Sequence, residues 1–61
     1  MRRFTLLLSG FGASGATANA RAELESARFT HLQADLVIRR VQQSFGPAGT
    51  PLMSAAEVRV A

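Results

Sequence analysis

Residues 30–45, THLQADLVIRRVQQSF, form the best-specified structural element of this sequence. Thr30, followed three residues later by Gln33, has the form of a capping box, in which each side chain bonds the backbone N–H of the other residue. The Gly-Pro pair at 46–47 supplies a C-terminal stop. The pattern predicts a helix over residues 31–45 with one buried face. The apolar residues recur at the spacing of such a face: Ala34, Val37, Ile38, Val41 and Phe45.

A strand and a second helix are predicted on the N-terminal side. Residues 3–8, RFTLLL, alternate as a short strand does, with one face formed by Phe4, Leu6 and Leu8. Residues 9–16, SGFGASGA, form a Gly-rich connector. A helix is predicted over about residues 17–28, where small apolar residues recur at helical spacing: Ala20, Leu24 and Ala27. Because this face is shallow, the helix needs a close-packed neighbour.

The C-terminal residues leave two alternatives open. Residues 46–53 are predicted to be a loop. Residues 54–57, SAAE, fit a capped helical turn, whereas residues 57–60, EVRV, alternate like a strand. The whole sequence therefore predicts one small domain over residues 1–61. Its fold class is α+β and mainly helical, with a short N-terminal strand, a Gly-rich connector, two helices, and an irregular tail that holds a short strand or a helical turn.

The size and composition of the chain predict that it depends on a partner. The chain has 61 residues, no cysteine and one histidine, His31. A domain this small buries only about 60% of the surface that its unfolded chain exposes, and it has no disulfide to add stability. Four scattered acidic residues do not make a metal site with His31: Glu23, Glu25, Asp35 and Glu57. We therefore expect no stable isolated monomer, and we expect a second copy or a larger assembly to supply stability.

Two short motifs suggest chemistry, but each lacks the context that the chemistry requires. GFGASG at 10–15 matches the dinucleotide-binding pattern, yet the chain has room for only one of the several strand–helix units that such a domain needs. Ser14 lies where a nucleophile elbow would place a serine, but Ala16 replaces the second glycine of that elbow. We interpret residues 10–15 as a hinge, and we expect no enzyme activity, catalytic residue, metal or cofactor.

The N-terminal residues also have features of a targeting segment. MRR at 1–3 precedes an apolar run, and ANA at 18–20 has the form of a signal-peptidase site. A small exported or organelle-imported protein is therefore an alternative. The apolar run is shorter than the ~7–15 residues of a secretory signal, so the cytoplasm is favoured. No stretch approaches the ~20 apolar residues of a transmembrane helix, and none is predicted.

Two stretches carry a family resemblance: RFTLLL at 3–8, and VIRRV at 37–41 after its capping hydroxyl. With the order strand, helix, helix over about residues 2–45, they resemble the Arc-type ribbon-helix-helix repressors. In that family two N-terminal strands pair across a dimer and enter the major groove as a β-ribbon. The resemblance implies base contacts from three strand residues, Arg3, Thr5 and Leu7, and a phosphate held by the backbone amides of Thr30 and His31.

The sequence therefore favours two binding functions over catalysis. Seven arginines against four acids give a net charge of +3, which fits contact with acidic protein or with phosphates. The first hypothesis is a small non-enzymatic interaction protein, a subunit of a homo-oligomer or larger assembly that docks on protein. The alternative is a dimeric DNA-binding regulator. Leu7 is apolar where the repressors usually carry a polar or basic residue, so protein docking ranks first. The candidate binding residues for either partner are Arg2, Arg3, Thr5, Leu7, Thr30, His31, Arg39 and Arg40.

Overall fold

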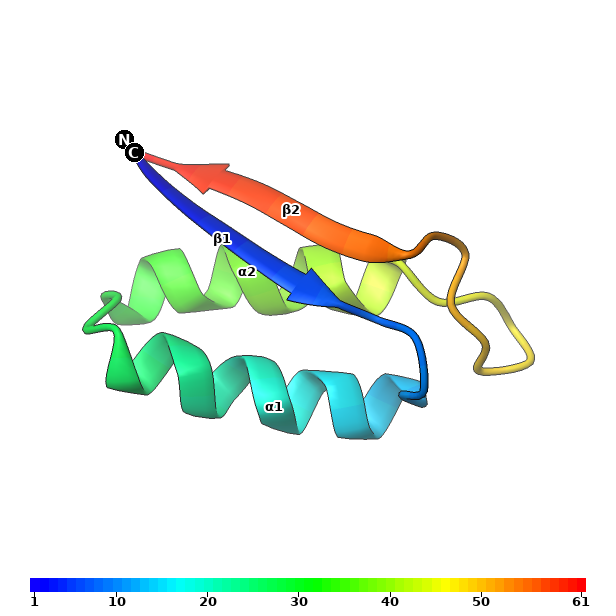
Figure 1. Cartoon of the computed structure of the whole chain (residues 1–61). Coiled ribbons are helices and arrows are strands. Elements are labelled where there is room, and N and C mark those ends of the chain that lie inside the picture. Colours follow the sequence, from blue (N-terminus) through cyan, green and yellow to red (C-terminus); the bar gives the residue numbers. More distant parts are fainter.

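The computed structural model covers residues 1–61 and has two layers, a small sheet and a pair of helices (Figure 1). The elements follow the order β1 (Arg2–Leu7), α1 (Ala13–Ser26), α2 (His31–Gln43) and β2 (Ala55–Val60). The two strands lie side by side over the helices, and the two chain ends meet at one end of the sheet. This arrangement confirms the predicted α+β fold, and it selects the strand for the C-terminal residues.

The sheet consists of β1 and β2 alone, paired antiparallel. Phe4 lies opposite Val58, and Leu6 lies opposite Ala56. Because side chains alternate between the two faces of a strand, these pairs share the face that packs on the helices. Apolar and charged residues alternate over positions 57–60 because one face of this strand is buried and the other is exposed. The sequence of the tail alone does not reveal that the strand pairs with the N-terminal residues.

One apolar core lies between the sheet and the helices. Both Ile38 and Val41 are buried, as the helical pattern of residues 30–45 predicts. α1 contributes mostly small side chains, so it packs closely against its neighbours. The buried apolar residues are Phe4, Leu6, Leu8, Ala16, Ala20, Leu24, Val37, Ile38, Val41, Ala56 and Val60.

The capping box of α2 is present. The Thr30 hydroxyl accepts a hydrogen bond from the Gln33 backbone N–H at 3.1 Å, and the Gln33 side-chain oxygen accepts one from the Thr30 N–H at 3.0 Å. The helix ends at Gln43 rather than at residue 45, which corrects the predicted boundary. The Ser44 N–H bonds Val41 O at 3.0 Å, and this tighter turn ends the α-helical pattern.

The predicted boundaries of α1 were wrong at both ends. The helix begins at Ala13, four residues before position 17, because the backbone of Gly12 serves as the N-cap. Small residues such as Ser14 are tolerated in a first turn, where the backbone N–H groups lack helical partners anyway. The chain between β1 and α1 is consequently short, and Gly10, at φ 85°, makes its turn.

At its C-terminal end, α1 stops at Ser26 because Arg28 adopts the left-handed conformation, with φ 63°. The Arg28 N–H bonds Glu25 O at 3.2 Å, and the Phe29 N–H bonds Leu24 O at 3.1 Å. These two bonds form a Schellman motif, which usually has glycine at the left-handed position. The predicted end at residue 28 missed this motif because an arginine stands where glycine is the usual signal.

Replacing Arg28 with glycine should stabilise the fold. Glycine adopts a positive φ without the steric cost that a side chain carries, so Arg28→Gly should raise the free energy of unfolding by about 0.5–1 kcal/mol. Urea denaturation at fixed protein concentration measures this change.

Arg21→Gly is the matched control, since Arg21 is exposed within α1. That substitution should lower the free energy of unfolding by about 1 kcal/mol, because glycine is a poor helix former. A loss of similar size for Arg28→Gly would show that the left-handed position does not limit stability.

Candidate functional site

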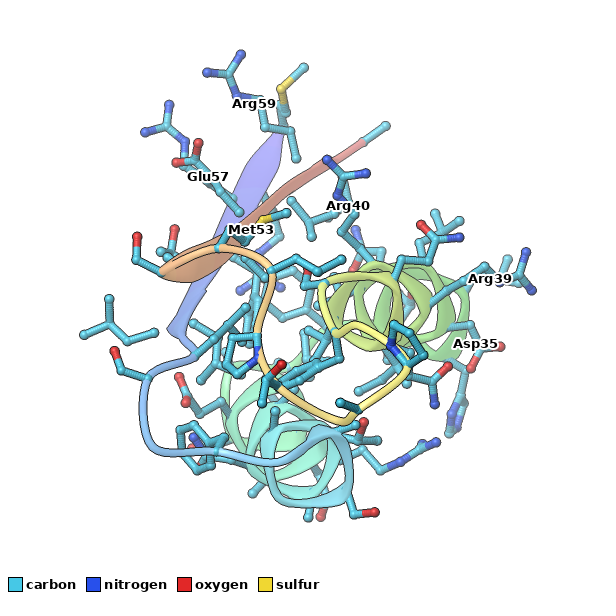
Figure 2. All side chains as sticks on the ribbon, turned by 90° about the vertical axis from the view of Figure 1, so that its right-hand side faces the viewer. Asp35, Arg39, Arg40, Met53, Glu57 and Arg59 are labelled. Atoms are coloured by element: carbon cyan, nitrogen blue, oxygen red, sulfur yellow. The ribbon has the colours of Figure 1, made fainter.

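The outer face of the sheet points away from both helices. Three cross-strand pairs form this face: Arg3 with Arg59, Thr5 with Glu57, and Leu7 with Ala55. Figure 2 shows Glu57 and Arg59 extending from the sheet on the side away from the helices. The face is thus polar and charged at the end near the chain termini, and apolar at the other end.

The charges on this face are unbalanced. Arg3 and Arg59 lie directly opposite each other, an arrangement that destabilises an antiparallel pair. The only acid on the face, Glu57, has its Oε2 at 3.9 Å from Arg3 Nε. Both side chains of this ion pair are more than half exposed, so the pair contributes only a few tenths of a kcal/mol. Arg59 has no acidic partner within the chain.

Both edges of the sheet carry unpaired backbone groups. The Leu8 N–H bonds Ser54 O at 2.9 Å and fixes the alternation of the ladder. Every second residue of β1, counted back from Leu8, points its backbone N–H and C=O groups toward β2. The residues between them point these groups outward, away from the neighbouring strand. The outward groups belong to Arg3, Thr5 and Leu7 on β1 and to Ala55, Glu57 and Arg59 on β2. None of the backbone hydrogen bonds outside regular elements involves these six residues.

Arg2, although a candidate binding residue, is engaged within the chain. Its guanidinium lies 3.8 Å above the ring of Phe29. It also donates hydrogen bonds to the carbonyl oxygens of Ala27, at 2.7 Å, and Arg28, at 3.3 Å. A cation is favoured there because the C-terminal carbonyls of α1 carry partial negative charge. Arg2 therefore ties β1 to the end of α1, whereas Arg3 faces solvent.

The other candidate binding residues lie on the helix layer. Thr30 uses its hydroxyl and N–H in the capping box, and exposed His31 begins α2. These two residues border a surface hollow of about 200 Å³ between the end of α1 and the start of α2. Arg39 and Arg40 are both exposed, but they diverge. In Figure 2, Arg40 rises beside the sheet, and Arg39 points outward on the side of Asp35.

The structure thus brings together Arg3, Thr5 and Leu7 and separates them from the other candidate residues. Sequence reasoning missed Glu57 and Arg59, although the alternation of EVRV was the signal that would place both on one face. It also missed the exposure of Leu36 on α2, which is 56% exposed, whereas Met53, which is 45% exposed, lies in the predicted loop. On the sheet face itself, Leu7 is 69% exposed.

Comparisons with known proteins add no identification. No protein-family model matches the chain, and no curated protein or solved structure resembles it significantly. The structure contains no cluster of three or more histidine or acidic side chains that is able to hold a metal ion. None of the helices combines the length and the apolar character that crossing a membrane requires.

Alanine substitutions should separate the roles of the two neighbouring arginines. Arg2→Ala removes the contact with Phe29 and two charged hydrogen bonds, so it should lower the free energy of unfolding by about 1–2 kcal/mol. Arg3→Ala should change it by less than about 0.5 kcal/mol, because only an exposed ion pair is lost. Urea denaturation of the two variants measures both effects, and equal losses would contradict the assignment.

Proposed function

We propose that this chain is a small non-enzymatic subunit that docks on a protein partner through its two-stranded sheet. The main support for this proposal is the set of outward-pointing backbone N–H and C=O groups along both edges of the β1–β2 sheet. An added strand from a partner would satisfy such groups with main-chain hydrogen bonds, and the alternating side chains would select the partner. An open edge of this kind is otherwise exposed to unspecific pairing.

The energetics of the small fold support docking. A two-stranded sheet is marginally stable in water without further support, and only 12 of the 61 residues are buried. Leu7, Leu36 and Met53 remain exposed on or beside the sheet. Covering these side chains would add about 25 cal/mol for each Å² of apolar surface removed from water. A bound partner would therefore supply stability that the small core does not.

Several features of the outer face favour protein over DNA as the partner. β1 pairs with β2 of its own chain. A DNA-binding ribbon made of the β1 strands of two copies would therefore have to use the one edge of β1 that remains open. Glu57 places a negative charge next to Arg3 on the face that would enter the groove, and Leu7 offers no hydrogen bond to a base edge. A ribbon-helix-helix-like DNA regulator is therefore the alternative outcome of the test.

The segment that has features of a targeting signal takes part in the core. Phe4, Leu6 and Leu8 are buried, and so are Ala16 and Ala20 of α1. Cleavage after residue 20 would remove β1 and about half of α1, along with these contacts. This participation supports a structural role for residues 1–20 within the docking subunit.

Position-specific photo-crosslinking in the producing cell tests the proposal. A benzophenone side chain placed at Ala55 should form adducts with protein, because this position lies on the sheet. The same group at Ser14, which is exposed on α1, is the control and should form few adducts. Equal adduct formation at Ala55 and Ser14 would contradict docking through the sheet.

A duplex-DNA titration provides the second arm of this test. We expect weak and largely unspecific binding that falls as salt rises, since a few arginines contacting phosphates produce such behaviour. The matched variant Arg3→Ala should weaken it only slightly. Nanomolar, sequence-selective binding at physiological salt, lost in Arg3→Ala, would contradict the protein-docking proposal and establish the DNA regulator.

A further inference from the structure

The open edge of β2 is complementary to itself. Its outward-pointing residues include Glu57 and Arg59, which lie on either side of Val58. Two copies of β2 pair antiparallel when a two-fold axis passes beside Val58. In this register Glu57 of each copy lies opposite Arg59 of the other, and both residues already point their backbone groups toward the new neighbour. The same residues thus supply ladder hydrogen bonds and two reciprocal ion pairs.

We infer that the partner is a second copy of this chain, joined edge to edge through β2. The two sheets then form one four-stranded antiparallel sheet in the order β1, β2, β2, β1, with all four helices on one face. The two-fold symmetry makes the interface isologous, so it closes with two chains and does not propagate. This inference rests on the proposed docking through the sheet and names its occupant.

The dimer resolves the charge imbalance of the outer face. Within one chain, Arg59 faces Arg3 and has no acidic partner. In the dimer, Arg59 lies between Arg3 of its own chain and Glu57 of the second copy. Each of the two outer-face rows that join Arg59 of one copy to Glu57 of the other then holds two arginines, one glutamate and one threonine. The acid that a single chain fails to supply comes from the symmetry-related strand.

Other edge pairings lack this complementarity. A two-fold axis beside Glu57 would place the two glutamates opposite each other, which is repulsive. Pairing through β1, with the axis beside Thr5, aligns Arg3 with Leu7 and gives no ion pair. Among these self-pairings, only the one centred on Val58 matches opposite charges at two positions.

The flank of α2 beside this edge also fits a second copy. The Gln33 Nε2 donates to the Ala61 carbonyl at 2.9 Å, so the start of α2 lies beside the end of β2. The other end of α2 lies beside the approach to β2, where the Leu52 N–H bonds Ser44 O at 2.8 Å. α2 and β2 therefore run antiparallel, and the middle of α2 lies level with the middle of β2.

Leu36 follows Gln33 by three residues, so it lies on this same flank of α2 and near the middle of the helix. Arg40 follows one turn later, and Figure 2 shows it on the side of α2 next to the sheet. A two-fold axis beside Val58 brings the Leu36 flanks of both copies together beneath the four-stranded sheet. Leu36, which is 56% exposed in one chain, is then covered by its counterpart.

Charge-swap variants test the inference. Sedimentation equilibrium over about 1 μM to 1 mM should show a monomer–dimer equilibrium for the native chain. Glu57→Arg makes the edge doubly positive, and Arg59→Glu makes it doubly negative. Each substitution removes two attractions and adds two repulsions per dimer, so each should raise the dimer Kd about 10- to 100-fold. Circular dichroism checks that each variant keeps its helices.

Mixing the two variants is the decisive step. In a mixed dimer every positive position of E57R lies opposite a negative position of R59E, so a 1:1 mixture should form heterodimers with near-native affinity. Sedimentation of the mixture, compared with each variant alone, measures this recovery. Failure of the mixture to associate, when both variants are folded, would overturn the pairing centred on Val58.

A proline in β1 is the matched control for edge choice. Thr5→Pro removes an outward-pointing N–H from the opposite edge, and edge strands tolerate proline at such positions. It should leave the dimer Kd within about two-fold of the native value. Loss of the dimer in T5P but not in E57R would overturn the inference in favour of the β1 edge.

A native chain that stays monomeric at all concentrations, yet crosslinks to another protein at Ala55, would overturn the second copy and leave the proposed docking function standing.

Discussion

The fold depends on the pairing of β1 with β2, which joins the two ends of the chain over a pair of helices. This pairing buries Phe4 and Leu6 from one strand and Ala56 and Val60 from the other. A sheet of two strands satisfies only half of its backbone hydrogen-bonding groups, because alternate residues point theirs outward. The β1–β2 pairing therefore completes the core and also leaves two open sheet edges. The proposed docking function is based on those edges.

The helix layer is built for close packing. α1 offers alanines and one leucine to the core, and the Schellman motif at its end turns the chain tightly into the capping box of α2. Arg2 secures the same corner through Phe29 and the last carbonyls of α1. One end of the molecule is thus occupied by internal contacts, which leaves Arg3 and Arg59 as the strand arginines available to a partner.

Local patterns predicted much of this fold from sequence. The capping box and apolar face of α2 are contained within residues 30–45, and the alternation of residues 3–8 placed Arg3, Thr5 and Leu7 together on one face. The start of α1 was missed because its first turn contains Ser14 and Gly15, which favour a loop locally. Tertiary burial of Ala16 outweighs that preference.

Long-range features were harder to predict. Whether the C-terminal residues form a strand depends on their pairing with Arg2–Leu7 at the other end of the chain, and no local pattern encodes that register. The charge pattern of Glu57 and Arg59 became informative only when the structure placed both on the open edge of β2. The contact of Arg2 with Phe29 likewise depends on the turn after α1. The left-handed residue of that turn is Arg28, so the sequence lacks the glycine that usually indicates such a turn.

Amide hydrogen exchange, measured by NMR at about 10 μM and about 1 mM protein, reports directly on pairing at the β2 edge. The outward-pointing amides of Glu57 and Arg59 should become more protected at the higher concentration, because they enter the ladder between two copies. The outward-pointing amides of Thr5 and Leu7 should exchange rapidly at both concentrations. Protection that grows with concentration at Thr5 and Leu7 instead, or at neither edge, would contradict assembly through β2.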